Sequence, residues 1–245
     1  MKRLIIALLL SLPVAALAAG GGGTAYTFDA DLGNEASLQR GAAAFMNYCS
    51  GCHSLQYLRY NRIAKDLNIP EELVRENLMF GTDKFGFPVA SSMPVKAEVW
   101  FGTVPPDLTL TARSRGDDWV YSFLKTFYLQ EGRPNGVNNL TLAGASMPHV
   151  LGPLQGWQAL QHDDAHAEGG GGHGPAAPNF EMIAEGSLSP KEYDRLVSDI
   201  TNFLVYAAEP AKLTRYALGV KVLFFLFIFT VLAYLLKREY WKDVH

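Results

Sequence analysis

The chain has 245 residues, a formal net charge of −3 and only two cysteines. The charge is unevenly distributed along the chain. Residues 19–211 contain 13 Lys+Arg and 22 Asp+Glu, which gives this region a formal charge of −9. A region this acidic repels nucleic acid and anionic lipid headgroups and would attract a basic protein partner, although acidity can also serve solubility alone.

The N-terminus carries the features of an export signal. Lys2 and Arg3 precede an apolar stretch over residues 4–12, too short to span a bilayer, and residues 16–18 read Ala-Leu-Ala. This order predicts a signal peptide over residues 1–18, cleaved after Ala18. The alternative is an uncleaved N-terminal anchor. In both cases residues 19–211 are exported, and they are numerous enough for one substantial core.

The first soluble helix is predicted just before the cysteines. Leu38, Ala42, Phe45 and Met46 recur at helical spacing and would form one apolar stripe. Gly41 on this helix would permit close approach of another helix, or it could be incidental.

The stretch "CSGCH" from Cys49 to His53 contains both thiols of the chain. Its spacing allows a redox dithiol, half of a zinc site or an attachment point for a c-type haem. A zinc site lacks its second ligand pair, and the thioredoxin-like alternation of strands and helices is absent. We therefore predict one covalent haem c, with Cys49 and Cys52 as thioether anchors and His53 as the proximal iron ligand.

The second iron ligand decides the redox role of such a haem, because a thioether raises the reduction potential and a second histidine lowers it. Two methionines lie in loops with the same Ser-Met-Pro sequence, Met93 and Met147. Met147 is favoured because a glycine- and proline-marked loop leads from it to the last soluble helix. Either methionine could instead fill a gap in the core.

Residues 161–179 read "QHDDAHAEGGGGHGPAAPN" and interrupt the compact pattern. Histidine- and glycine-rich stretches of this kind are more often solvated loops than metal sites.

The last soluble helix begins with Ser189, Pro190 and Glu192, a capping box with proline at the first helical position. Pro210 marks its end. One apolar face follows from the 3.6-residue spacing of Tyr193, Leu196, Val197, Ile200, Phe203, Leu204 and Ala207.

The C-terminus contains a predicted membrane anchor over residues 212–236, with one charge, Lys221, near the start of its apolar run. Lys237, Arg238 and Lys242 follow, which favours a cytoplasmic tail over residues 237–245.

Together these residues resemble the cytochrome c1 family of ubiquinol–cytochrome c reductase (bc1) complexes. The resemblance covers nearly the whole mature chain. CxxCH is common to all c-type cytochromes, whereas the Pro-Pro-Asp-Leu element and the Ala-Ala-Glu-Pro junction into one C-terminal helix are much more specific. The stretches that carry it are "CSGCHSLQYLRYNR", "LMFGTDKFGFP", "PPDLTLTARSRGDDWVYSFL", "GASMP" and "YAAEP".

The resemblance implies a mostly α fold, a class I cytochrome c-like haem domain with long loop insertions and one C-terminal transmembrane helix. It implies Met147 as the second iron ligand, because the family's haem methionine follows the Pro-Pro-Asp-Leu element and precedes the last soluble helix. A family arginine shortly after that element pairs with a haem propionate, which by spacing is Arg115, with Arg113 second. Pro105 and Pro106 would form haem-pocket wall.

The resemblance also implies outer-sphere electron transfer within an enzyme complex, with no substrate chemistry on this subunit. The haem would take electrons from a Rieske iron–sulfur protein and pass them to a basic cytochrome c, and the C-terminal helix would pack on cytochrome b. We expect a dimeric complex in a bacterial inner membrane, with the haem domain periplasmic. In this family acid clusters can meet the partner cytochrome, which makes Asp163, Asp164 and Glu168 candidates.

Three alternatives remain open from the sequence. The first is a membrane-tethered cytochrome c that serves a terminal oxidase or a nitrogen-oxide reductase without a bc1 complex. The second is a haem enzyme with an open iron site. The third is a dithiol oxidoreductase or assembly protein without haem.

Overall fold

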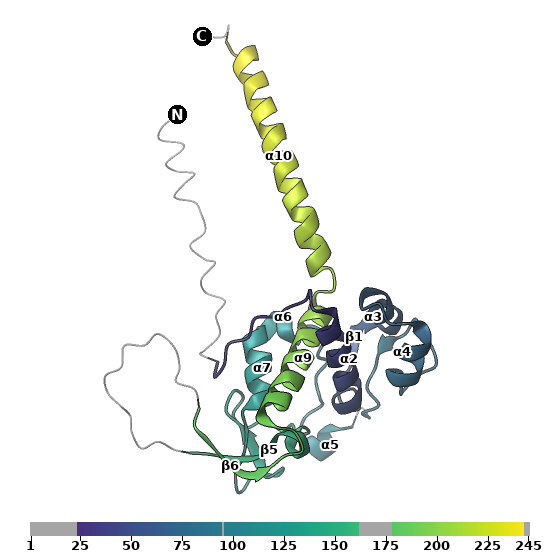
Figure 1. Ribbon diagram of the computed structural model, residues 1–245, viewed down its shortest axis with the longest axis vertical. Helices are drawn as coiled ribbons and strands as arrows, with labels where there is room; N and C mark the ends of the chain where they lie inside the picture. The colour runs from purple at the N-terminus through teal and green to yellow at the C-terminus, as the bar shows by residue number, and fades with distance from the viewer. Residues whose placement is uncertain (1–23, 95, 162–177, 243–245) are drawn as a thin grey trace, which may run out of the picture. The chain divides into compact units, whose positions relative to one another are not determined.

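The computed structural model describes residues 24–94, 96–161 and 178–242, and most of their regular structure is helical (Figure 1). These residues divide into two compact units, each of which is described by itself. Unit 1 comprises the described residues of 1–29, 94–105 and 114–198, and unit 2 those of 30–93, 106–113 and 199–245. Two helices contribute residues to both units: α6 (Thr111–Arg115) and α9 (Pro190–Ala208).

Unit 2 begins with α2 and ends with the apolar helix α10. Strands β1 and β2 pair antiparallel, with Leu55 opposite Val89 and an irregularity before Arg59. The whole elements of this unit are α2 (Glu35–Tyr48), β1 (Leu55–Arg59), α3 (Tyr60–Asp66), α4 (Glu71–Asn77), β2 (Pro88–Val89) and α10 (Lys212–Tyr240).

Helix α2 forms where the sequence predicts it. Leu38, Ala42, Phe45 and Met46 are all buried, which confirms the apolar stripe. The Asn34 side chain caps the helix by accepting a hydrogen bond from the Ser37 backbone N–H at 3.1 Å.

Helices α2 and α9 pack closely because Gly41 lies at their contact. A Cβ on Gly41 would lie 2.0 Å from the Asp199 carbonyl oxygen and 2.8 Å from Phe203 Cβ. The rings of Phe45 and Phe203 meet with centroids 5.8 Å apart. The packing therefore requires a glycine at position 41. This confirms the interpretation that Gly41 permits close approach of another helix.

A polar network fixes the same contact. The buried Asp199 carboxylate accepts hydrogen bonds from the Ser37 hydroxyl at 2.6 Å and from Arg40 Nε at 2.6 Å. Asn202 donates to the Ser37 hydroxyl at 2.9 Å and accepts from the Asp31 backbone N–H at 3.0 Å. Each polar side chain buried here has a partner, so burial leaves no orphaned group.

Unit 1 contains two antiparallel hairpins that the sequence pattern does not predict. Strand β3 pairs β4 with Tyr128 opposite Asn138, and β5 pairs β6 with Leu160 opposite Phe180. The whole elements of this unit are α5 (Glu98–Phe101), α7 (Asp117–Lys125), β3 (Phe127–Leu129), β4 (Val137–Asn139), α8 (Gly152–Gln155), β5 (Gly156–Leu160) and β6 (Phe180–Glu185).

Helix α9 confirms the predicted capping box. The Ser189 backbone N–H donates to the Glu192 carboxylate at 2.9 Å, and the Glu192 backbone N–H donates to the Ser189 hydroxyl at 3.4 Å. The helix ends at Ala208, two residues before Pro210. All predicted face residues are buried except Leu196, which is half-buried.

Helix α10 is the one helix in the described part of the chain that is long and apolar enough to cross a membrane, over Thr214–Tyr240. It continues four residues past the predicted end at Leu236. Lys237, Arg238 and Glu239 favour helix and extend it. The predicted signal peptide, most of the 161–179 stretch with Asp163, Asp164 and Glu168, and residues 243–245 lie outside the described residues.

Candidate haem site

The "CSGCH" stretch forms a single turn directly after α2. Cys49 caps the helix, its backbone N–H donating to the Phe45 carbonyl at 2.8 Å. The Cys52 and His53 backbone N–H groups both donate to the Cys49 carbonyl, at 3.0 and 2.8 Å. One compact turn therefore carries both thiols and the imidazole, the arrangement that attachment to two vinyl groups and one iron requires.

His53 is buried, with 8% of its surface exposed. Its Nδ1 lies 2.8 Å from the Pro106 carbonyl oxygen. Because a carbonyl can only accept, Nδ1 must carry the proton, which leaves the Nε2 lone pair for a metal. Desolvation lowers the pKa of His53, partly offset by Pro106 and Asp107, so the ring is neutral as a ligand must be.

The Pro-Pro-Asp-Leu element is held beside His53 by its aspartate. Asp107 accepts hydrogen bonds from the backbone N–H groups of Gln56 at 2.8 Å and Thr109 at 2.9 Å. The Leu108 backbone N–H donates to the Ser54 carbonyl at 2.9 Å. These bonds place the Pro106 carbonyl at the imidazole, a role of its backbone that the sequence alone does not predict.

In unit 1, the loop that contains Met147 is fixed by side chains of the β3–β4 hairpin and its turn. Arg133 Nη2 donates to the Ala145 carbonyl at 3.0 Å, and Asn135 Nδ2 donates to the Ser146 carbonyl at 2.6 Å. Asn138 Oδ1 accepts from the Gly144 backbone N–H at 2.7 Å. Met147 is half-buried, so its thioether is partly accessible at the end of a fixed loop.

Two residues after Met147, the buried His149 stacks on Phe127 with ring centroids 4.8 Å apart and meets the edge of Trp157. Desolvation lowers the pKa of His149 to about 4, so the ring is neutral. Its buried Nε2 and Gln155 Oε1 both lack a hydrogen bond of normal geometry among the described residues, but the Gln155 side chain interacts with this imidazole and partly offsets the fall in its pKa. Gln155 is therefore the candidate partner of this nitrogen, whose burial does not point to a missing group.

The remaining predicted site residues are more exposed. Arg113 and Arg115 both lie on α6 with exposed side chains, and neither forms an ion pair with a described carboxylate. The Arg115 guanidinium lies over the Trp119 ring, 5.1 Å from its centroid. Pro105 is half-buried in unit 1 and Met93 is half-buried in unit 2.

The two non-haem interpretations of the cysteines gain no support from their surroundings. Burial raises the pKa of the Cys49 thiol to about 12, with Cys52 adding to the rise, whereas a dithiol oxidoreductase needs a thiolate near neutral pH. For zinc, the described ranges contain no cluster of three or more His, Cys, Asp and Glu side chains that could hold a metal ion.

Comparison with known proteins identifies the family. The model described as "Cytochrome C1 family" matches residues 26–79 and 174–244. Cytochrome c1 of Allochromatium vinosum is 54% identical over 247 aligned residues, covering 100% of both chains. This chain belongs to the cytochrome c1 family. A second relative in the comparison, the "Ammonia monooxygenase gamma subunit" of Nitrosomonas europaea, is 40% identical and covers 99% of this chain and 100% of its own.

Among solved structures, a chain titled "Hyperthermophilic respiratory Complex III" aligns over 100% of this chain and 98% of its own, with 14% identity and a TM-score of 0.44.

Members of the cytochrome c1 family carry one covalent haem c. The residues present fit that group, because one turn carries two thiols, and a buried neutral imidazole keeps its Nε2 free beside them. The family assignment also confirms the mostly α fold that the sequence predicts.

Proposed function

We propose that this chain is the haem-bearing electron-transfer subunit of a bc1 complex. The observation that carries the proposal is the His53 imidazole, oriented by the Pro106 carbonyl directly after the two cysteines, in a member of the cytochrome c1 family. Cys49 and Cys52 anchor the haem and His53 binds its iron. The bound haem supplies outer-sphere electron transfer, and this chain's residues hold it and exclude water.

The proposed path runs from a Rieske iron–sulfur protein through this haem to a basic cytochrome c. Residues 1–18 direct export and are cleaved, and α10 anchors residues 19–211 to a bacterial inner membrane with the haem domain on the periplasmic side. The cytoplasmic tail follows α10, which packs on a cytochrome b subunit within a dimeric complex. The exposed apolar side chains of α10 support this assignment, because lipid or a partner helix must cover them.

Met147 is the proposed second iron ligand. Three side chains fix the loop before it, and a half-buried thioether lies at its end. Arg115, with Arg113 as the second candidate, is proposed to pair with a haem propionate, because an exposed guanidinium without an ion-pair partner can bind a carboxylate. Pro105 and Pro106 are proposed as pocket wall.

The decisive experiment is purification of the chain from its native membrane, followed by identification of every subunit and haem type. A complex with cytochrome b and a Rieske protein, active as a ubiquinol–cytochrome c reductase, is the expected result. If the chain carries its haem but purifies without both subunits, it is instead a tethered cytochrome c for an oxidase or reductase.

The Nitrosomonas europaea relative favours one further candidate, a subunit of an ammonia monooxygenase assembly, since that protein's name places it there. The same purification separates the two. Copurification with monooxygenase subunits and no cytochrome b would support the second candidate. The site residues serve electron transfer in either assembly.

A haem enzyme with an open iron site predicts a different outcome for one substitution. In a His/Met carrier, Met147→Ala removes the thioether, so the low-spin spectrum is lost and the reduction potential falls by on the order of 0.1 V or more. Met93→Ala, the same substitution in the matching Ser-Met-Pro loop, serves as control. If both variants keep the spectrum and the potential, the iron site is open, whereas a change in Met93→Ala only would make Met93 the ligand.

Haem staining after denaturing electrophoresis tests the third alternative. The stain follows the polypeptide if the thioether bonds exist. If the stain separates from the polypeptide, there is no thioether bond, and the dithiol oxidoreductase remains as the interpretation of Cys49 and Cys52.

A further inference from the structure

A shallow hollow in unit 2 is lined by cations and by no carboxylate. Its lining residues are Tyr57, Arg59, Asn61, Arg62 and Lys65, from β1 and α3. Three of these five side chains are positively charged, within an exported region whose formal charge is −9. We call Tyr57, Arg59, Arg62 and Lys65 the basic surface.

These cations are largely uncompensated. Arg59 donates through Nη1 to the Gly86 carbonyl at 2.6 Å, a neutral partner, and neither Arg59 nor Lys65 forms an ion pair with a described carboxylate. Arg62 pairs through Nε with Asp66 at 2.5 Å, yet its side chain is 47% exposed. Two of the three cations of the basic surface, Arg59 and Lys65, are therefore available to an external anion, and the third, Arg62, is paired but exposed.

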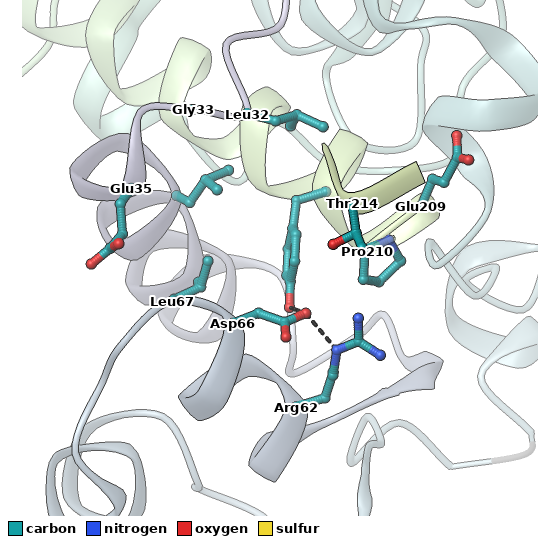
Figure 2. A pocket seen from close by; sticks show the side chains of 11 residues that line it. Leu32, Gly33, Glu35, Arg62, Asp66, Leu67, Glu209, Pro210 and Thr214 are labelled. Atoms are coloured by element: carbon teal, nitrogen blue, oxygen red, sulfur yellow. Dashed lines mark hydrogen bonds and ion pairs between the residues drawn. The ribbon is translucent and has the colours of Figure 1, made fainter. Parts of the chain in front are cut away.

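The basic surface is connected through Arg62 to the N-terminal end of α10. Arg62 also lines a second pocket together with Glu209, Pro210 and Thr214, and Thr214 is the first residue of the candidate membrane span (Figure 2). The headgroup layer occupies about 5–7 Å on each side of the hydrocarbon core, where the first turn of such a helix lies. Arg62 thus shares a pocket with the residue at which the candidate span begins.

The carboxylates of that second pocket are already partnered. Asp66 accepts hydrogen bonds from Arg62 and, at 3.0 Å, from the Tyr206 hydroxyl. Glu209 pairs with Arg215 at 2.7 Å, and Glu35 accepts from Asn68 at 2.8 Å. Each carboxylate of this pocket thus has a partner within unit 2, and Asp66 takes Arg62 from the basic surface, which leaves Arg59 and Lys65 as its unpaired cations.

Tyr57 adds an independent indication of the interface. It is 74% exposed, so its ring is free to lie in a headgroup layer. Tyrosines concentrate at the headgroup level of membranes, because the ring prefers the interface and the hydroxyl remains hydrated.

From this placement we propose that the basic surface binds the phosphate of an anionic phospholipid headgroup, phosphatidylglycerol, at the membrane surface where α10 enters. The proposal needs α10 to span the membrane and does not depend on the electron-transfer partners. The acidity of the exported region does not oppose it, because charges beyond a Debye length of about 8 Å are screened.

The test uses the haem-loaded full chain in phosphatidylcholine vesicles with trace spin-labelled phosphatidylglycerol or phosphatidylcholine. The measured quantity is the preference of the protein-associated lipid for phosphatidylglycerol. We expect Arg59→Gln/Arg62→Gln/Lys65→Gln to lower this preference about tenfold, since each interfacial cation contributes roughly a fivefold factor at most. Arg59→Gln/Lys65→Gln, which keeps the Arg62–Asp66 pair, should lose part of it.

The matched control is Lys96→Gln/Lys191→Gln/Arg195→Gln, which removes the same charge from exposed positions in unit 1. It should keep the wild-type preference, including the part contributed by Lys212 and the C-terminal cations. An equal loss in the control, or none in folded variants of the basic surface, overturns the proposal.

Two further outcomes would also overturn it. If 10 mM glycerol phosphate displaces the labelled lipid completely, the basic surface binds glycerol phosphate with a dissociation constant of about 1 mM or less. That result would indicate a site for soluble phosphate. If the variants keep the lipid preference and instead lose copurifying subunits, the basic surface belongs to a protein interface.

Discussion

Asp107 connects two segments of backbone at the haem site. Its carboxylate accepts from Gln56 and Thr109 and so holds the Pro106 carbonyl at His53 Nδ1. We expect Asp107→Ala to destabilise the protein by about 2 kcal/mol, because two charge-assisted hydrogen bonds are lost. Urea unfolding followed by Soret absorbance measures this.

The same substitution should also alter the iron, because a loosened Nδ1 hydrogen bond makes the imidazole a weaker donor. We expect a higher reduction potential in Asp107→Ala and a smaller rise in Asp107→Asn, which keeps one acceptor oxygen. The exposed Asp83→Asn is the control. A loss of stability with an unchanged potential would show that Asp107 does not act through His53.

At this scale the sequence predicted what contiguous residues can encode. The two thiols and the imidazole lie within five positions, so their common chemistry could be recognised directly. The partner of His53 Nδ1 could not, because Pro106 lies 53 positions away and contributes a carbonyl oxygen, a group that every residue has. Asp107 belongs to the Pro-Pro-Asp-Leu motif, but the sequence does not show that its carboxylate bonds to Gln56, 51 positions away.

At the scale of elements, the α2–α9 contact depends on a missing side chain. Gly41→Ala places a methyl group 2.0 Å from the Asp199 carbonyl oxygen, and backbone on both helices must shift to accommodate it. We expect a loss of about 3 kcal/mol in the free energy of unfolding. Gly86→Ala is the control, because its Cβ would meet no atom within 4 Å, and it should stay within about 0.5 kcal/mol of wild type.

The Gly41 prediction has a clear counter-result. If Gly41→Ala unfolds at the same urea concentration as Gly86→Ala, the two helices are not in close contact in solution.

A second contact joins the start of α9 to α7. Asp194 accepts hydrogen bonds from Lys125 at 2.5 Å and from the Tyr121 hydroxyl, and Lys125 also lies 4.6 Å from the centroid of the Tyr26 ring. Burial alone would raise the pKa of Asp194, but the bonds from Lys125 and Tyr121 outweigh it and lower that pKa.

A lowered carboxyl pKa fixes the direction of a pH effect. The stabilisation by Asp194 is complete above its unfolded pKa, near 4, and is lost as the pH falls through the lower folded value. Relative to Asp194→Asn, wild type should be more stable by at most about 1 kcal/mol at pH 6, since the carboxylate is half exposed, and the difference should vanish in strong acid. Unfolding of both proteins from pH 6 to pH 2 measures it. In a Lys125→Met background, the proteins with and without Asp194→Asn should differ little in stability from pH 6 to pH 2. A difference as large as that with Lys125 present would mean that the pH effect does not come from the Lys125–Asp194 pair.

The elements differ in how far the sequence predicted them. Helices α2, α9 and α10 were predicted because an apolar stripe, a capping box or a long apolar run lies within the helix itself. The β3–β4 hairpin was not, because its strands are three residues long and too short for a period-2 pattern, and the five- and six-residue strands β5 and β6 lie on either side of the 161–179 stretch, far apart in the sequence. Their stability comes from partners elsewhere, such as Gln158, which donates to the Phe127 carbonyl at 2.7 Å.

For the whole molecule, charge and hydrophobicity separate along the chain. Residues 19–211 carry a formal charge of −9, whereas the positive charges near the C-terminus follow the apolar span of α10. That separation was predictable, because charge and hydropathy are additive along a sequence. The basic surface was not, since it needs β1 and α3 to place their cations together while neighbouring carboxylates take internal partners.

The acidity of residues 19–211 has a kinetic consequence if the acceptor is a basic cytochrome c. Opposite charges accelerate encounter, and salt screens them, so the second-order rate of electron transfer should fall about tenfold between 0.05 and 0.5 M ionic strength. Stopped-flow oxidation of the reduced full chain by a basic cytochrome c measures this. An uncharged small oxidant provides the reference, because its rate should be nearly independent of salt.

Two charge-matched triple variants show whether position matters beyond total charge. Asp163→Asn/Asp164→Asn/Glu168→Gln removes the acids of the 161–179 stretch, and Glu72→Gln/Glu76→Gln/Glu98→Gln removes three exposed acids elsewhere. If the first set meets the acceptor, its rate at low salt falls several-fold further than that of the second. Equal rates in the two variants would mean that the acceptor responds only to overall charge, because long-range steering depends on the summed field whereas contact depends on place.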